Sequence, residues 1–279
     1  MRERPQRAVF PDGRLGLRHG PIELVIGAEG PARAAALEAA ERRFATILEE
    51  LVAELPLLRQ PPAALPEGPT ARRMWAAARP HAARVFVTPM AAVAGAVAEE
   101  ILAAMVASGP LVKAYVNDGG DIALHLEAGA TYAAAIRGLD GSELGRFTIR
   151  PEDGIGGVAT SGRGGRSLSL GIGESVTALA ATAAAADAAA TLLANAVDLP
   201  GHKAIRRVPA RDLQPDSDLG DRPVTVEVGP ITEAEADEAL ARGFAEAEWM
   251  RGAGLIRGAL LHLRGRTRIL SPDPSLADA

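Results

Sequence analysis

The sequence contains no cysteine, and this absence excludes whole classes of chemistry. Without thiols the chain cannot form disulfides, thiolate zinc sites or a cysteine nucleophile, and it cannot be lipidated through cysteine. Aromatic residues are also scarce, at 3% of the 279 residues. Because apolar residues still make up 48%, the core must be built from alanine, valine, leucine and isoleucine.

A basic surface and a strongly apolar run are missing as well. The formal net charge of −5 argues against nucleic-acid binding, since phosphate contacts require a basic face. The longest apolar run, 177–193, contains an aspartate and is mostly alanine, which is too weakly apolar for a membrane span. Residues 1–17 carry charges but not the apolar core of a secretory signal. We therefore expect a soluble cytoplasmic protein without nucleic-acid or membrane partners.

Strand and helix patterns are mixed along the chain. Strands are expected at 8–17 and 21–26, around turns at 11–13 and 19–20, and at 85–88, 111–116, 122–126, 133–139, 145–149, 175–179, 224–228 and 254–264. Helices are expected at 31–56, 72–78, 90–108 and 233–251, and in the alanine-dense segment that ends at 195. A proline-rich surface loop is expected at 60–70, a loop at 211–221 and a disordered tail at about 271–279. Because the elements do not alternate strictly, they predict an α+β layered fold in a single domain, 1–279.

The alanine-dense helix contains one acid. Asp187 is the only charged residue between Glu174 and Asp198, and Thr191 follows one helical turn later on the same face. A carboxylate and a hydroxyl are hard oxygen ligands of the kind that Mg²⁺ takes. The alternative is an exposed Asp187 and a Thr191 bonded back to its own helix. A lone acid on an otherwise uncharged helix favours a partner for its carboxylate, but the sequence leaves both interpretations open.

A loop rich in glycine and hydroxyl groups precedes that helix. Residues 160–167 read TSGRGGRS, so the loop offers hydroxyls, backbone amides that we expect to be free, and the guanidinium groups of Arg163 and Arg166. Glycines allow close backbone approach and arginines donate in pairs, which is the chemistry of a phosphate cradle. It is not a Walker sequence, because no Gly-Lys-Ser/Thr occurs. A flexible surface loop is the alternative.

An acidic turn, residues 117–121 with the sequence NDGGD, separates two predicted strands. It fits a tight hairpin. Its two acids and amide, at the end of a buried strand, would equally suit a ribose or an adenine edge. The five histidines are scattered without metal-ligand spacing, and a structural or surface role is expected for each.

Four short motifs, in this order, resemble the ApbE superfamily. They are Thr88-Pro89-Met90-Ala91, then Asn117 with Gly119-Gly120-Asp121-Ile122, then Ala159-Thr160-Ser161-Gly162, and finally Ala186-Asp187-Ala188-Ala189-Ala190-Thr191. Their order and spacing cover residues 10–270, and the later Leu219-Gly220 and Gly254-Leu255-Ile256 fit the same pattern. The sequence is most similar to the uncharacterised, thiamine-biosynthesis-like branch of the superfamily.

The resemblance implies a layered ApbE-like, T-fold-like fold of mixed and antiparallel sheets with packed small-residue helices. Members of the family proper bind FAD and require Mg²⁺; they cleave the FAD pyrophosphate and transfer FMN to a protein threonine, or hydrolyse FAD. By resemblance, Mg²⁺ would be held by Asp187, Thr191 and a backbone carbonyl near Ala92. The residues that would border the flavin or its phosphates are Gly119, Gly120, Asp121, Thr160, Ser161, Gly162, Arg163 and Arg166. No catalytic residue is assigned.

Two motifs of the transferases are replaced in this sequence. Their Lys-Gly-Tyr is Gly95-Ala96-Val97 here, and their His-x-x-Asp-Pro is represented by residues 164–169, GGRSLS. Two functions therefore stay open: Mg²⁺-dependent FMN transfer or FAD pyrophosphate hydrolysis, and non-catalytic ligand binding or assembly on the same fold. The expected ligand is a phosphorylated small molecule, a flavin nucleotide first, with a pterin or another nucleotide as alternatives. The small-residue helices would suit close packing in a homodimer.

Overall fold

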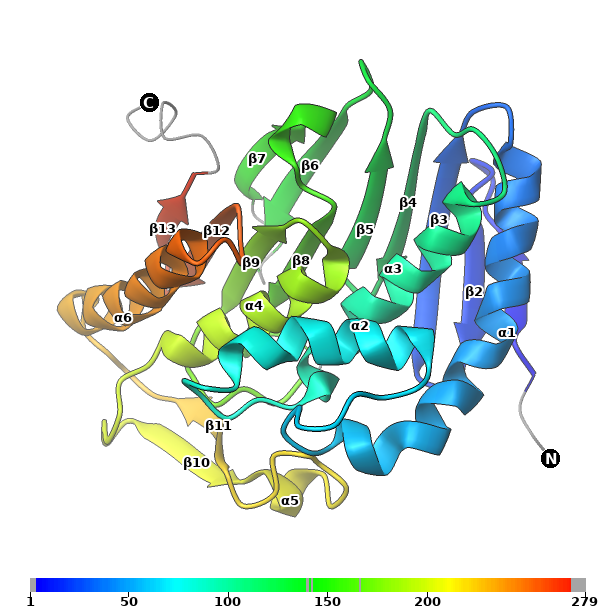
Figure 1. Cartoon of the computed structure of the whole chain (residues 1–279). Coiled ribbons are helices and arrows are strands. Elements are labelled where there is room, and N and C mark those ends of the chain that lie inside the picture. Colours follow the sequence, from blue (N-terminus) through cyan, green and yellow to red (C-terminus); the bar gives the residue numbers. More distant parts are fainter. Residues whose placement is uncertain (1–3, 139–140, 142, 166, 272–279) are drawn as a thin grey trace. The chain divides into compact units, whose positions relative to one another are not determined.

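The computed structural model of the chain describes residues 4–138, 141, 143–165 and 167–271 (Figure 1). These residues form two compact units. Unit 1 takes the described residues within 1–132, 148–159 and 180–187, and unit 2 takes those within 133–147, 160–179 and 188–279. Both the strand at 157–161 and the helix at 183–196 have residues in each unit.

An antiparallel sheet is the framework of unit 1. Its strands follow in the order β1 (Gln6–Val9), β2 (Leu15–His19), β3 (Ile22–Glu29), β4 (Lys113–Asp118), β5 (Asp121–Leu126) and the first residues of β8 (Gly157–Ser161). Strand β3 shows why this segment forms a sheet: Ile22, Leu24 and Ile26 alternate with less buried residues, so one face lies in the core.

Helices cover one face of this sheet. The helical elements of unit 1 are α1 (Arg33–Leu58), α2 (Pro69–Ala78), η1 (Arg79–His81), η2 (Pro89–Ala92), α3 (Val93–Val106), η3 (Pro151–Asp153) and the first residues of the helix at 183–196. Helix α1 contacts β2 and β3, α3 contacts β4 and β5, and α2 packs against α1 and α3 (Figure 1). The three- and four-residue apolar spacing of α1 brings Phe44, Ile47 and Leu51 into the core.

Helix α3, together with η2 before it, is strongly apolar. Within the described chain, Pro89–Val106 is the one segment long and apolar enough to cross a membrane, with a mean hydropathy of 1.6 over 18 residues. In the structure 56% of this segment is buried, and its acids Glu99 and Glu100 form ion pairs with Arg73. Burial by neighbouring elements and internal charge pairing are the properties of a helix in a protein core.

Unit 2 contains four strand pairings and a long helix. Strand β9 (Ser175–Ala180) pairs antiparallel with β12 (Gly258–Leu263), which pairs antiparallel with β13 (Arg266–Leu270). Helix α6 (Glu233–Gly252) packs on β12 and β13. The other elements are the two-stranded sheets β6 (Tyr132–Arg137) with β7 (Glu143–Ile149) and β10 (Ile205–Pro209) with β11 (Pro223–Val228), and the short helix α5 (Ala210–Leu213).

The α+β class predicted from the sequence is confirmed. The strand predicted at 85–88 is wrong: these residues form no strand, and Thr88 instead caps η2 by accepting a hydrogen bond from the Met90 amide at 3.3 Å. The first helix ends near Pro56, as predicted: α1 includes Pro56 in its last turn and ends at Leu58. Strands β8, β10 and β13 were not predicted. The single-domain organisation stays a prediction, and the expected tail from 272 onward lies outside the described residues.

Candidate metal site and adjoining turn

Helix α4 (Ala183–Ala196) carries the candidate metal ligands. Its alanines let other elements approach closely, and Asp187 in its second turn is only 8% exposed. The Oδ2 atom of Asp187 accepts a hydrogen bond from the Gly95 amide at 2.9 Å. Gly95 lies in the first turn of α3, where backbone amides have no acceptor within their own helix. The acid predicted to have a partner therefore has one, the N-terminus of α3.

The surroundings of Asp187 are rich in negative charge. Burial raises the pKa of Asp187 well above its ordinary value, and the nearby carboxylates of Asp121 and Asp118 raise that pKa further, against the opposing effect of the Gly95 and Ala94 amides. Among the described residues of unit 1, no basic side chain forms an ion pair with Asp187. A buried carboxylate within electrostatic range of two others favours a bound cation.

The acidic turn between β4 and β5 brings its predicted residues to this place. Asp118 and Asp121 face one another across the strand pair, and Gly119 and Gly120 connect them with φ of 64° and 115°. Positive φ at both positions is what a two-residue hairpin turn requires, and glycine adopts it without strain. The Gly120 amide donates to Oδ1 of Asn117 at 2.8 Å. The turn is thus a hairpin, as one interpretation predicted, and it also lies within electrostatic reach of Asp187.

Close backbone contacts fix the start of α4. A Cβ atom at Gly95 would lie 2.3 Å from the carbonyl oxygen of Ala183 and 2.8 Å from Cβ of Asp187. On β8, a Cβ atom at Gly157 would lie 2.4 Å from the backbone of Ala183. Side chains at 95 or 157 would therefore collide with the first turn of α4. The close approach of α3 explains why Gly95 stands here without a functional group.

A second carboxylate, which the sequence analysis did not single out, also contacts α4. Oε2 of Glu99 accepts a hydrogen bond from the Ala184 amide at 3.2 Å, and the Thr182 hydroxyl accepts one from the Ala185 amide at 3.2 Å. Glu99 is in turn ion-paired with Arg73 of α2. A signal was present in the sequence: Glu99 and Glu100 are the only charged residues in 90–108.

The remaining predicted metal ligands lie on the same two helices. Ala92 is fully buried and is the N-cap residue of α3. Thr191, partly buried, follows Asp187 by one turn in α4. Among the described residues, no group of three or more His, Asp or Glu side chains is arranged to hold a metal ion. A metal here would need hydroxyl, carbonyl, water or phosphate oxygens to complete its ligands, which is the donor set that the sequence predicted.

The loop after Ala159 belongs to unit 2 and is more strongly bonded than expected. The Thr160 and Thr177 hydroxyls are 2.8 Å apart and hydrogen-bonded. The Arg163 amide donates to the Gly173 carbonyl at 2.8 Å, and the Gly165 amide donates to the Gly162 carbonyl at 3.0 Å. The expectation of free amides is therefore wrong at these two positions, because the loop uses them for its own backbone hydrogen bonds.

Two further features of this loop concern its predicted phosphate ligands. Gly162 has a φ of 138°, and a Cβ atom there would lie 2.6 Å from the Glu174 carbonyl oxygen, so packing within the loop explains this glycine. Ser161 is partly buried. Nε of Arg163 is buried without a hydrogen-bond partner among the described residues. Arg166 lies outside the described residues. Phosphate binding by this loop stays a prediction.

Comparison with known proteins gives matches of three kinds. The chain is 35% identical to a UPF0280 protein of Archaeoglobus fulgidus over 121 residues, which are 43% of this chain and 49% of that protein. It is 39% identical to a UPF0280 protein of Methanothrix thermoacetophila over 159 residues, 54% of this chain and 64% of that protein. The chain thus spans about half to two thirds of the length of these relatives.

Among solved structures, the apo form of the Pseudomonas stutzeri flavinyl transferase ApbE aligns with a TM-score of 0.45 at 14% identity, over 99% of this chain and 98% of that chain. The flavin transferase ApbE from Vibrio cholerae aligns with a TM-score of 0.37 at 14% identity, over 96% and 97%. The model of the family described as AbpE bacteria matches residues 7–269. Because that match covers nearly the whole sequence, the resemblance seen in the motifs is confirmed, and the chain belongs to the AbpE bacteria family.

Proposed function

We propose that this protein binds a flavin nucleotide, or a related phosphorylated ligand, together with Mg²⁺. One observation carries the proposal: the buried Asp187 carboxylate of α4 accepts from the start of α3 and lies within electrostatic range of Asp118 and Asp121, although these elements are far apart in sequence. We propose a flavin nucleotide before other ligands because the resemblance to the ApbE superfamily implies it. Membership of the AbpE bacteria family supports that resemblance.

The donor atoms at this place suit Mg²⁺. The Asp187 carboxylate, the Thr191 hydroxyl and the Ala92 carbonyl would hold the ion, and water and ligand phosphate oxygens would complete an all-oxygen shell. When bound, Mg²⁺ would neutralise charge that develops on a pyrophosphate. The chain's own contribution is to hold Asp187 in place through the Gly95 amide and to keep the carboxylate out of bulk water.

The test is a titration of the native protein with FAD, with and without Mg²⁺, followed by flavin fluorescence and calorimetry. We expect FAD binding that strengthens with Mg²⁺, and we expect Asp187→Asn to lose most of the Mg²⁺ dependence, because one metal ligand is gone. Asp216→Asn, at an exposed position of unit 2, is the matched control and should behave as the native protein does. Absence of FAD binding would exclude the flavin; equal Mg²⁺ dependence in Asp187→Asn would exclude the metal assignment.

A second candidate function is ligand binding without catalysis. The observation that favours it is the start of α3, where Gly95 has no room for a side chain and Ala96 and Val97 are fully buried. The Lys-Gly-Tyr that the transferases carry at this place has no functional equivalent in these three residues. Incubation with FAD and Mg²⁺, followed by chromatography, tests the FAD hydrolysis that the resemblance implies: an active hydrolase consumes one water and releases FMN and AMP, whereas a protein that only binds FAD returns it intact.

A further inference from the structure

The N-terminal turns of α3 and α4 cap one another through two carboxylates. Asp187 of α4 accepts from the Gly95 amide of α3 at 2.9 Å. In the opposite direction, Glu99 of α3 accepts from the Ala184 amide of α4 at 3.2 Å. Both amides belong to first turns, where no acceptor exists within the helix itself. The pair of hydrogen bonds therefore ties the orientation of each helix to that of the other.

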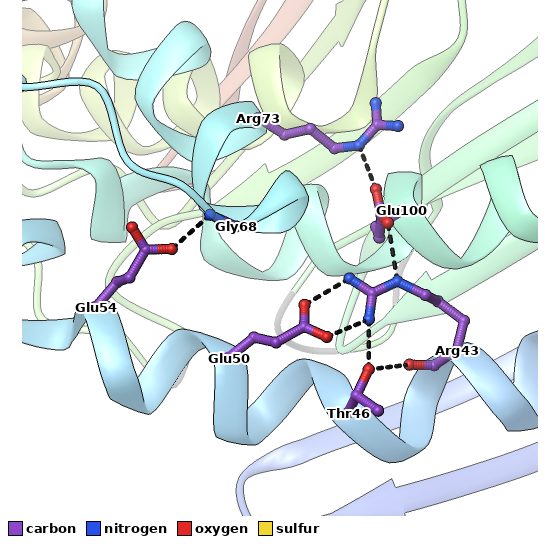
Figure 2. Close-up of polar contacts among 7 residues, drawn as sticks. All are labelled: Arg43, Thr46, Glu50, Glu54, Gly68, Arg73 and Glu100. Carbon is purple, nitrogen blue, oxygen red and sulfur yellow. Dashed lines mark hydrogen bonds and ion pairs between the residues drawn. The ribbon is translucent and has the colours of Figure 1, made fainter.

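Glu99 is itself fixed by a charge network that runs through α1, α2 and α3. Arg73 of α2 binds Glu99 and also binds Glu100, with Nε 2.9 Å from the Glu100 carboxylate. Glu100 accepts from Nε of Arg43 at 2.9 Å, and Arg43 donates to both carboxylate oxygens of Glu50 at 2.7 and 2.8 Å (Figure 2). The side chains of Glu99 and Glu100 are 18% and 11% exposed, so water screens these pairs less than it screens surface pairs.

The geometry of α4 transmits this restraint to Asp187. Ala184 and Asp187 are three residues apart, so both face the same side of the helix. Gly95 leaves no free space against Ala183, so α4 cannot slide toward α3 to restore a lost contact. Without the bond from Glu99, the start of α4 would keep its backbone packing against Gly95, but its hydrogen bond to α3 would run through the carboxylate that is to bind the metal.

We propose that Glu99, held by Arg73, is a positioning residue for the Asp187 carboxylate: it fixes the first turn of α4 and, with it, the direction of that carboxylate. The consequence for a metal rests on the proposed function. The positioning itself does not, because it acts on the hydrogen bond between Asp187 and Gly95 and is measurable without metal.

The primary test measures hydrogen exchange of the Gly95 amide by NMR on metal-free protein. Glu99→Ala leaves Gly95 and its acceptor unchanged, yet we expect the Gly95 amide to exchange about tenfold faster, since one of the two hydrogen bonds that set the orientation of α4 is lost. Glu99→Gln keeps an acceptor for Ala184 and should restore slow exchange. Glu50→Gln perturbs the far end of the same charge network, at the Arg43–Glu50 pair, and is the matched control, with no expected change.

A second test measures the affinity for Mg²⁺ by calorimetry. Glu99→Ala should weaken it about tenfold, the lower end of what the loss of a supporting residue around a metal costs, and Glu99→Gln should recover most of it. If Glu99→Ala does not fold, Glu99→Asp replaces it, because the shorter side chain cannot reach Ala184 while it stays with Arg73. Unchanged Gly95 exchange in the folded variant would overturn the positioning role. Absence of Mg²⁺ binding by native protein would overturn the proposed function alone, and Gly95 exchange would still decide the role of Glu99.

Discussion

At the scale of single residues, Gly95 sets how closely α3 and α4 approach. The atom nearest to a Cβ at this position is a backbone oxygen, 2.3 Å away, and backbone cannot move aside as a flexible side chain can. We predict that Gly95→Ala lowers the free energy of unfolding by about 1–3 kcal/mol, the usual range for overpacking. Urea unfolding followed by circular dichroism measures this.

The matched control for that substitution is Gly252→Ala. Gly252 is the last residue of α6 and has open space where a Cβ would stand. Alanine there should leave stability unchanged or raise it slightly, since it lowers the entropy of the unfolded chain. Equal effects of the two substitutions would show that the contact between Gly95 and Ala183 is not tight.

Single residues also show how much of the candidate site could be predicted from the sequence. The rule that a lone charge on an apolar helix has a partner correctly predicted a buried, bonded Asp187, and the same rule applied to 90–108 would have found Glu99. The partners themselves could not be predicted, because Gly95 and Ala184 contribute backbone amides, which every residue except proline has. The amides of the 160–165 loop were misjudged for the same reason: their acceptors come from loop geometry, not from residue type.

At the scale of elements, α6 begins with a capping box that makes a pH-dependent contribution to stability. Thr232 accepts from the Glu235 amide at 3.3 Å, and the Glu235 carboxylate accepts from the Thr232 amide at 2.6 Å and contacts His202 at 3.0 Å. These hydrogen bonds, that of the Thr232 amide first, lower the pKa of Glu235 from 4.5 to about 2. The native state therefore binds this proton less tightly than the unfolded state does.

Because the folded pKa is the lower one, the contribution of Glu235 is complete above the unfolded value of 4.5 and is lost as the pH falls toward about 2. We predict that Glu235→Gln flattens the loss of stability in this window, measured by urea unfolding at a series of pH values. Glu248→Gln, at an exposed position of the same helix, is the control and should keep the native slope. A Glu235→Gln protein with the native slope would contradict the assignment.

Elements with a strong local signal were predicted, and those that depend on a neighbour were not. Helix α6 shows its start in the Thr232 cap, and α1 shows its apolar period. Strand β8, by contrast, reads as a loop of glycine and hydroxyl residues. It becomes a strand through pairing with β5, and its Gly157 is needed where the strand meets Ala183. The apolar stretch at 85–88 looks like a strand but has no pairing partner in the described chain, so it stays irregular.

At the scale of the whole molecule, the acids inside the protein lie in two different electrostatic environments. Around Glu99 and Glu100, arginines from other helices neutralise the acids, although the chain as a whole is acidic with a net charge of −5. Asp187, by contrast, lies within electrostatic range of two further acids, Asp118 and Asp121, and no basic side chain of the described part of unit 1 pairs with it. A raised pKa means that ionisation of Asp187 destabilises the native state at neutral pH. The fold tolerates a stability loss here, as expected where function requires the charge.

This contrast predicts how the whole protein responds to metal. Mg²⁺ that binds only the native state raises its stability by about 2.7 kcal/mol at a free concentration one hundred times the dissociation constant, so thermal unfolding should shift upward with Mg²⁺ and return with a chelator. Metal-free Asp187→Asn should unfold no lower than the native protein, because a destabilising charge is gone while an oxygen remains for the Gly95 amide, and it should not respond to Mg²⁺. Sodium chloride at equal ionic strength separates binding from screening of surface charge. An equal rise with either salt, or an equal response of Asp187→Asn, would show that these carboxylates do not bind the ion.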